Sequence, residues 1–223
     1  MDILYEDNHL IAVAKRPGQP TQGGGKHGLA LLDEVKQFIK KRDHKPGNVF
    51  IGLLHRLDKP VGGVVLFAKT SKGASRISAQ IREHEFYKEY EALVEGQVDD
   101  HGWVIQWLVK NRSHNIVTAF DEPVKNGLYA ELSYRCLKRG SVSRVLVTPV
   151  TGRPHQIRVA FASLKHPIIG DKKYGSHQDY PNGIALYATS ITFLHPTSKE
   201  EITVTSPSPF MEPNHFHMAC GNG

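Results

Sequence analysis

The stretch FYKEYEALV, residues 86–94, alternates strictly along its length. Side chains of an extended chain point to opposite faces in turn. One face of this stretch therefore carries Phe86, Lys88, Tyr90, Ala92 and Val94. A period of two over nine residues is typical of a β-strand. Residues 86–94 are predicted to form a strand, and an aromatic side chain in the position of Tyr90 usually belongs to the core.

Further strands are predicted on both sides of this one. Short apolar runs at 3–5 and 9–15 enclose Glu6-Asp7-Asn8 and indicate an N-terminal β-hairpin. Apolar and β-branched runs predict strands at residues 50–54, 63–68, 142–150, 184–194 and 202–204. Residues 103–137 give several weaker strand signals. Strands thus make up most of the predicted elements.

Helices are predicted singly between the strands. Apolar spacing indicates a helix at 29–41, another at 71–82 with Ser71 as its N-cap, and a third at 154–164 opened by Pro154. The predicted fold class is therefore α+β, with a mixed, mostly antiparallel central sheet flanked by helices and loops. We expect one domain over residues 1–210 and an irregular C-terminal tail over residues 211–223.

The composition favours a soluble protein with a polyanionic partner. Lys and Arg number 28 against 22 Asp and Glu, which gives a formal net charge of +6. Positive charge suits a phosphate backbone, because each neutralised phosphate releases counterions. The two cysteines, Cys136 and Cys220, lie far apart and indicate a reducing compartment. With no signal peptide and no run of some 20 apolar residues, a cytoplasmic location without membrane contact is expected.

Two motifs for cofactors or metals are set aside. Gly23, Gly25 and Gly28 satisfy G-x-G-x-x-G, but no strand precedes them, and no P-loop motif occurs in the chain. Neither a nucleotide cofactor nor any other is expected. Among thirteen histidines, the only tight cluster with usable ligands is His215, His217 and Cys220. Chain ends usually fray, so no metal site is predicted there.

Two segments carry unusual charge patterns. In HRLDKPVGG, residues 55–63, the carboxylate of Asp58 is surrounded by cations, which favour its ionised form and suit a nucleophile. A salt-bridged turn is the plainer interpretation. In TGRPHQIR, residues 151–158, Arg158 lies beside the apolar stripe of the predicted helix and needs a carboxylate partner if it is buried. Arg153 and His155, at the exposed start of that helix, are placed to bind phosphate.

Together these segments resemble the RluA-type family of pseudouridine synthases. The resemblance runs from YEDNHLIAVAKRPG through HRLDKPVGGVVLFAKT, FYKEYEALVEG and TGRPHQIRVAFASLKHPIIGDKKYG to ALYATSITFLHP, and so covers most of the chain. It implies a single catalytic domain of the pseudouridine synthase fold, which isomerises uridines in ribosomal or transfer RNA. A monomer that needs no cofactor is the matching expectation.

The resemblance also implies residue roles. Asp58 matches the catalytic aspartate, Arg158 the arginine that pairs with it, and Tyr90 the tyrosine that contacts the target base. Arg56 matches the arginine that fills the space left by the flipped nucleotide, and Leu186 an apolar contact in the substrate pocket. RNA-binding roles are expected for four residues: Arg56, Lys88, Arg153 and His155. Many relatives read Asp-x-x-Thr-Ser-Gly where this chain has DKPVGG, so the bonds behind Asp58 must differ.

Two other functional classes compete with the isomerase. A non-catalytic RNA-binding or ribosome-assembly module could use the same scaffold, but binding alone does not require an aspartate near RNA phosphates. A hydrolase with Asp58 as nucleophile should show a second carboxylate placed as acid or base, and none is evident in the sequence. The attack of Asp58 on the ribose or on the base stays open.

Overall fold

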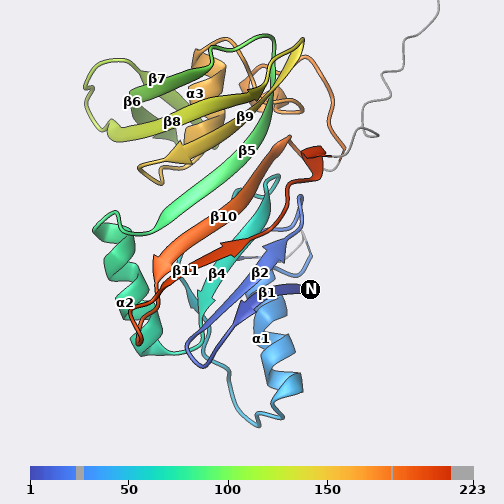
Figure 1. Cartoon of the computed structure of the whole chain (residues 1–223), viewed down its shortest axis with the longest axis vertical. Helices are drawn as coiled ribbons and strands as arrows, with labels where there is room; N and C mark the ends of the chain where they lie inside the picture. The colour runs from blue at the N-terminus through green and yellow to red at the C-terminus, as the bar shows by residue number, and fades with distance from the viewer. Residues whose placement is uncertain (24–27, 182, 212–223) are drawn as a thin grey trace, which may run out of the picture.

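The computed structural model describes residues 1–23, 28–181 and 183–211, and Figure 1 shows these ranges as one long sheet with helices packed against it. The strands are β1 (Asp2–Glu6), β2 (Leu10–Lys15), β3 (Gly52–Leu53), β4 (Gly62–Ala68), β5 (Tyr87–Glu95), β6 (His101–Asn111), β7 (Ile116–Phe120), β8 (Leu128–Lys138), β9 (Val142–Pro149), β10 (Leu186–Leu194) and β11 (Glu201–Thr205). The α-helices are α1 (Leu31–Arg42), α2 (Ser71–Arg82) and α3 (Gln156–Ser163), and two 3₁₀ turns, η2 (Lys172–Tyr174) and η3 (Pro209–Met211), complete the elements.

The eleven strands form a single sheet in the order β1-β2-β4-β10-β5-β9-β8-β6-β7, with β11 paired to β10 and β3 to β4. Only the pair of β10 and β4 is parallel among the strands described. The predicted α+β class with a mixed, mostly antiparallel sheet is confirmed. Strands β5 and β10 lie at the centre and connect the two halves of the molecule in Figure 1.

Alternation along the strands divides the core into layers. Val65 and Phe67 of β4 pack in the same cluster as Val35 of α1. Their neighbours Val64 and Leu66 pack in a second cluster, which includes Ile77 of α2, Phe86 and Phe193. Helix α3 covers the other half of the sheet, where Val159 contacts Leu108, Val117 and Ala130. Each helix therefore buries an apolar stripe against a sheet face of matching period.

Several predicted boundaries are corrected by local backbone geometry. The N-cap of α2 is Thr70 and not Ser71, because Thr70 is still extended and its Oγ1 accepts a hydrogen bond from the Gly73 amide. Helix α3 does not open at Pro154: it begins at Gln156, after His155 adopts a left-handed conformation with φ of 55°. The strand predicted at 50–54 shortens to Gly52–Leu53. Conversely, the weak signals over 103–137 belong to three strands, the short β7 and the 11-residue strands β6 and β8.

Some predictions fall on residues outside the described ranges. Gly25 of the glycine motif and the tail cluster of His215, His217 and Cys220 are among them. The division at residue 210 stays a prediction. No helix in the ranges that the structure covers has the length and apolar character to cross a membrane.

Candidate active site

A cleft of about 1110 Å³ opens where the two halves of the sheet meet. Its walls come from the loop between β3 and β4, from β5, from the segment leading into α3, and from β10. It brings together every site residue predicted from the sequence: Arg56, Asp58, Lys88, Tyr90, Arg153, His155, Arg158 and Leu186. Residues up to 130 positions apart in the sequence thus line the same cleft.

Asp58 lies in the loop that precedes β4. The amide of Val61 donates to the carbonyl of Asp58 at 3.0 Å and closes the turn. Behind it, the hydroxyl of Thr21 donates to the carbonyl of Leu57 at 2.8 Å, and the ammonium of Lys15 donates to the carbonyl of Lys59 at 3.2 Å. These contacts from the N-terminal segment hold the loop without the hydroxyls of the Thr-Ser-Gly sequence.

Arg158 reaches Asp58 from α3. Its Nη1 donates to Asp58 Oδ2 at 3.1 Å, so the predicted partnership of these two groups is present. Its other two nitrogens, Nε and Nη2, donate to the two carboxylate oxygens of Asp171 at 2.7 and 2.8 Å. Burial alone lowers the pKa of Arg158, but the hydrogen bonds and the charge of Asp171 outweigh it, and the net pKa lies above the ordinary value. The guanidinium therefore stays charged and is fixed in orientation.

Asp171 is the principal site-supporting residue that sequence reasoning missed. Its side chain is 2% exposed, and it forms the closer ion pair with Arg158. A buried arginine requires a carboxylate partner, and this requirement could have indicated Asp171. The resemblance already supplied Asp58 as that partner, so no second carboxylate was sought. Asp171 follows Gly170 in an irregular segment, where no periodic pattern indicates which way a side chain points.

Tyr90 and Leu186 form the inner wall of the cleft. Tyr90 is 9% exposed and Leu186 is 4% exposed, and they sit on the paired central strands β5 and β10. Burial raises the pKa of Tyr90 well above its ordinary value, and the negative charge of Asp58 raises it further. The phenol therefore stays protonated at neutral pH and offers a ring with a hydrogen-bond donor.

The structure corrects the prediction for His155. It was expected on an exposed helix start as a phosphate ligand, but it is 9% exposed. The left-handed backbone at this position turns the ring inward, where Nδ1 lies 2.6 Å from the hydroxyl of Tyr174 and Nε2 lies 3.9 Å from Asp58 Oδ2. Burial lowers the pKa of His155, so the ring is mainly neutral at pH 7 and supplies no cation to a phosphate.

Cations surround the mouth of the cleft. Arg56 and Arg153 are exposed, as expected for contacts with a phosphate backbone, and Lys88 is half-buried on the wall. Burial lowers the pKa of Lys88. Three further basic residues that the sequence did not single out also line the cleft: Arg82, Lys110 and Lys173. The cleft therefore has a positively charged rim.

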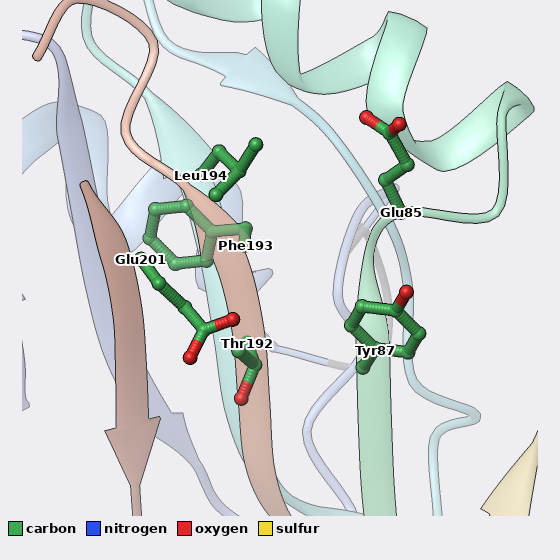
Figure 2. A pocket seen from close by; sticks show the side chains of 6 residues that line it. All are labelled: Glu85, Tyr87, Thr192, Phe193, Leu194 and Glu201. Carbon is green, nitrogen blue, oxygen red and sulfur yellow. The ribbon is translucent and has the colours of Figure 1, made fainter. Parts of the chain in front are cut away.

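A second hollow of about 190 Å³ lies elsewhere along β5 (Figure 2). Its lining consists of Glu85, Tyr87, Thr192, Phe193, Leu194 and Glu201. Its ionisable side chains other than tyrosine are carboxylates, which repel phosphate. Over the described ranges, no group of three or more His, Cys, Asp or Glu side chains is arranged to hold a metal ion.

A comparison with known protein families matches residues 9–163 to the family described as RNA pseudouridylate synthase. The chain belongs to this family. The matched region contains Asp58, Tyr90 and Arg158 and all of the cleft lining except Lys173 and Leu186. The predicted relationship to pseudouridine synthases, a class of RNA isomerases, is therefore confirmed.

Individual relatives support the assignment. A tRNA pseudouridine synthase C of Haemophilus ducreyi is 33% identical, covering 92% of this chain and 90% of that protein. A ribosomal large subunit pseudouridine synthase C of Buchnera aphidicola is 31% identical over 92% of this chain and 67% of that protein. The chain thus spans about two thirds of the length of the ribosomal relatives that it matches.

A solved structure has the same fold as this chain. Human RNA Pseudouridylate Synthase Domain Containing 1 superposes with a TM-score of 0.76 at 24% sequence identity. The superposition covers 94% of this chain and 84% of the human one. The sheet described above is therefore the pseudouridine synthase fold.

Proposed function

We propose that the chain converts uridines of structured RNA to pseudouridine and that Asp58 is the nucleophile. One observation carries this proposal: Asp58 Oδ2 lies 3.1 Å from the fixed guanidinium of Arg158, in a cleft that also contains Tyr90. A carboxylate that a fixed guanidinium orients at a cleft is placed to act as a nucleophile.

The reaction needs little beyond these groups. The target uridine leaves its stack, which is least costly in RNA loops, and its base enters the cleft against Tyr90. Ionised Asp58 attacks the nucleotide at the ribose or at the base, and the bond between N1 and the ribose breaks. The base turns, carbon 5 bonds to the ribose and the bond between Asp58 and the nucleotide breaks, which restores the carboxylate. Carbon 5 loses its proton and N1 gains one. Atoms and electrons balance within the nucleotide, so the step requires no oxidant and no donor.

The basic rim indicates how RNA is held. Arg56 and Arg153 are exposed at the mouth, and Lys88 lies deeper in the cleft. Such residues neutralise phosphates and position the strand without reading its sequence. The relatives are named for ribosomal and for transfer RNA, and both classes are proposed substrates. We propose further that the protein acts as a cytoplasmic monomer without a cofactor.

One experiment tests the nucleophile. Ribosomal and transfer RNA transcripts carrying tritium at uracil carbon 5 are incubated with the parent protein or with Asp58→Asn, and tritium released to water is counted. We expect the substitution to lower turnover by about 10³-fold or more, because a carboxamide is not a nucleophile of comparable strength. RNA binding and the melting temperature should stay close to those of the parent.

Product analysis in the same reactions separates the functional classes. Pseudouridine in the RNA supports the isomerase, free uracil indicates a hydrolase, and neither product indicates a binding module. Near-native turnover by Asp58→Asn would show that another group is the nucleophile.

A further inference from the structure

The two oxygens of the Asp58 carboxylate have different surroundings. Oδ2 accepts from Nη1 of Arg158 at 3.1 Å and lies 3.9 Å from Nε2 of His155. Oδ1 accepts no hydrogen bond from the residues that the structure describes. Oδ2 therefore faces two nitrogens of the protein, whereas Oδ1 has no hydrogen-bond donor among the described residues.

A chain of hydrogen bonds favours one of the two neutral tautomers of His155. The backbone amide of Val117 in β7 lies 2.9 Å from the hydroxyl of Tyr174, and an amide N–H only donates. The tyrosine oxygen is therefore an acceptor there. Its own proton is then available to Nδ1 of His155, 2.6 Å away. With Nδ1 accepting, the hydrogen of the neutral imidazole sits on Nε2, the nitrogen that faces Asp58.

The surroundings of Tyr174 hold this chain in place. Its ring lies against the guanidinium of Arg158, with 5.0 Å from the guanidinium carbon to the ring centroid. Tyr174 ends the 3₁₀ turn η2, which begins directly after Asp171. One short segment, Asp171 to Tyr174, thus anchors both groups that face Asp58 Oδ2: Arg158 through Asp171, and His155 through Tyr174.

We propose that His155 is a positioning residue that donates its Nε2 hydrogen to Oδ2 of Asp58, so that Oδ1 is the attacking oxygen. The inference rests on the proposed function of Asp58. At 3.9 Å the contact is longer than a hydrogen bond, and a movement of about 1 Å closes it. Hydrogen bonds of a catalytic site are often long without substrate and shorten when the substrate binds. The donor then fixes the carboxylate plane and directs its free oxygen into the cleft.

Two substitutions at His155 distinguish the loss of a donor near Asp58 from an effect of backbone strain. His155→Asn tolerates the left-handed backbone, but its amide ends near the position of Nδ1 and does not reach Asp58. His155→Gln is one methylene longer and brings an amide N–H close to the position of Nε2. Tyr174→Phe removes the hydroxyl that orients the ring and leaves His155 itself unchanged. His166→Asn is the matched control, because that histidine bonds the carbonyl of Glu95 through Nδ1 and does not line the cleft.

The measurement is tritium release from the 5-tritiated transcripts, with kcat and KM determined separately and melting followed for each variant. We expect His155→Asn to lower kcat by about 10- to 100-fold, the effect of one hydrogen bond to a charged group, with little change in KM. His155→Gln should recover part of this loss, and Tyr174→Phe should lower kcat less, by about 3- to 10-fold. His166→Asn should behave like the parent.

Each result decides between the alternatives. A parent without activity contradicts the proposed function itself, whereas an active parent with an equally active, folded His155→Asn overturns only the role of His155. A rise in KM at constant kcat overturns it as well, and so does a His155→Gln protein no better than His155→Asn. If His155→Asn does not fold, Tyr174→Phe decides: undiminished kcat in that variant contradicts the hydrogen-bond chain.

Discussion

The two faces of strand β5 have opposite character. Lys88 and Tyr90 point into the cleft of about 1110 Å³, whereas Tyr87 lines the acidic hollow of about 190 Å³ shown in Figure 2. By alternation, Glu89 and Glu91 share the face of Tyr87. The nine-residue strand β5 therefore separates a positively charged surface from a negatively charged one.

The carboxylates of the second face have structural partners. Glu91 forms an ion pair with Arg144 of the neighbouring strand at 2.9 Å, and Glu89 accepts from the hydroxyl of Ser190 at 3.0 Å. Such cross-strand contacts stabilise the sheet. On these charges we expect RNA phosphates to favour the cleft side and to avoid the opposite surface. Substitutions on the two faces should therefore have different consequences.

The largest difference is expected in the loss of stability when a carboxylate on each face is replaced. Asp171→Asn removes the closer partner of the buried Arg158, and the loss of one partner of a buried ion pair costs about 3–5 kcal/mol of unfolding free energy. Glu91→Gln leaves Arg144 partly exposed to water, with 23% of its side chain accessible, and should cost about 1 kcal/mol or less. Urea unfolding monitored by circular dichroism measures both. Equal losses would show that the cleft face has no special dependence on its buried charge.

A second difference is expected between the two tyrosines. Tyr90→Phe removes a protonated hydroxyl that faces the cleft, and turnover should fall by about 10²-fold if that group takes part in proton transfer. Tyr87→Phe, three residues earlier on the opposite face, should leave turnover unchanged. Tritium release from 5-tritiated RNA gives both values. A fully active Tyr90→Phe protein would restrict Tyr90 to a stacking role.

The parts of the site that the sequence predicted are those with a local signature. The period of two over 86–94 places Lys88 and Tyr90 on one face, and the cations around Asp58 mark a carboxylate of unusual surroundings. The apolar stripe of 157–164 places Arg158 against the body of the protein. Each of these signals needs only a few neighbouring residues, and the structure brings all three segments to one cleft.

The parts that were missed depend on tertiary contacts. Asp171 meets Arg158 through an irregular turn, so no spacing rule connects them. His155 was assigned to the surface because a helix start is normally exposed, but a single left-handed residue reverses its direction. By residue type Ser71 is the better N-cap, and only the extended backbone of Thr70 and its hydrogen bond identify Thr70 as the cap.

A third, smaller difference concerns RNA affinity. Lys88→Ala removes one cation from the cleft and should weaken RNA binding by about tenfold and reduce the salt slope by about one unit. Glu201→Gln, in the acidic hollow, removes a repulsive charge from the other face and should not weaken binding. Filter binding of transfer RNA at several salt concentrations measures both variants. Weaker binding by the Glu201 variant would show that RNA contacts the surface with the acidic hollow and not the cleft.

The smallest effect is the pH dependence of stability on the cleft face. The ring of His55 packs against that of Phe86 at a tilt of 51°, with centroids 5.4 Å apart, and its Nε2 accepts from the amide of Leu66 at 3.0 Å. Burial lowers the pKa of His55 to about 3, and the charge of Lys88 adds to this effect. Between pH 6.5 and 5 the unfolded chain therefore binds a proton at His55 that the folded chain does not. Stability is lost as the pH falls through this window.

His55→Gln tests this assignment, because its side-chain carbonyl still accepts from Leu66 but does not titrate. His55 contributes a slope of at most about 1.4 kcal/mol per pH unit, and the glutamine variant should lack it. Glu6 does not interfere here, because the hydrogen bond from Arg42 lowers its pKa below the ordinary 4.5 and its contribution is lost only at lower pH. Urea unfolding at pH 6.5, 5.75 and 5 gives both slopes. Parallel slopes for the two proteins would mean that His55 is protonated in the folded state, and that the interior wall of the cleft admits a charge.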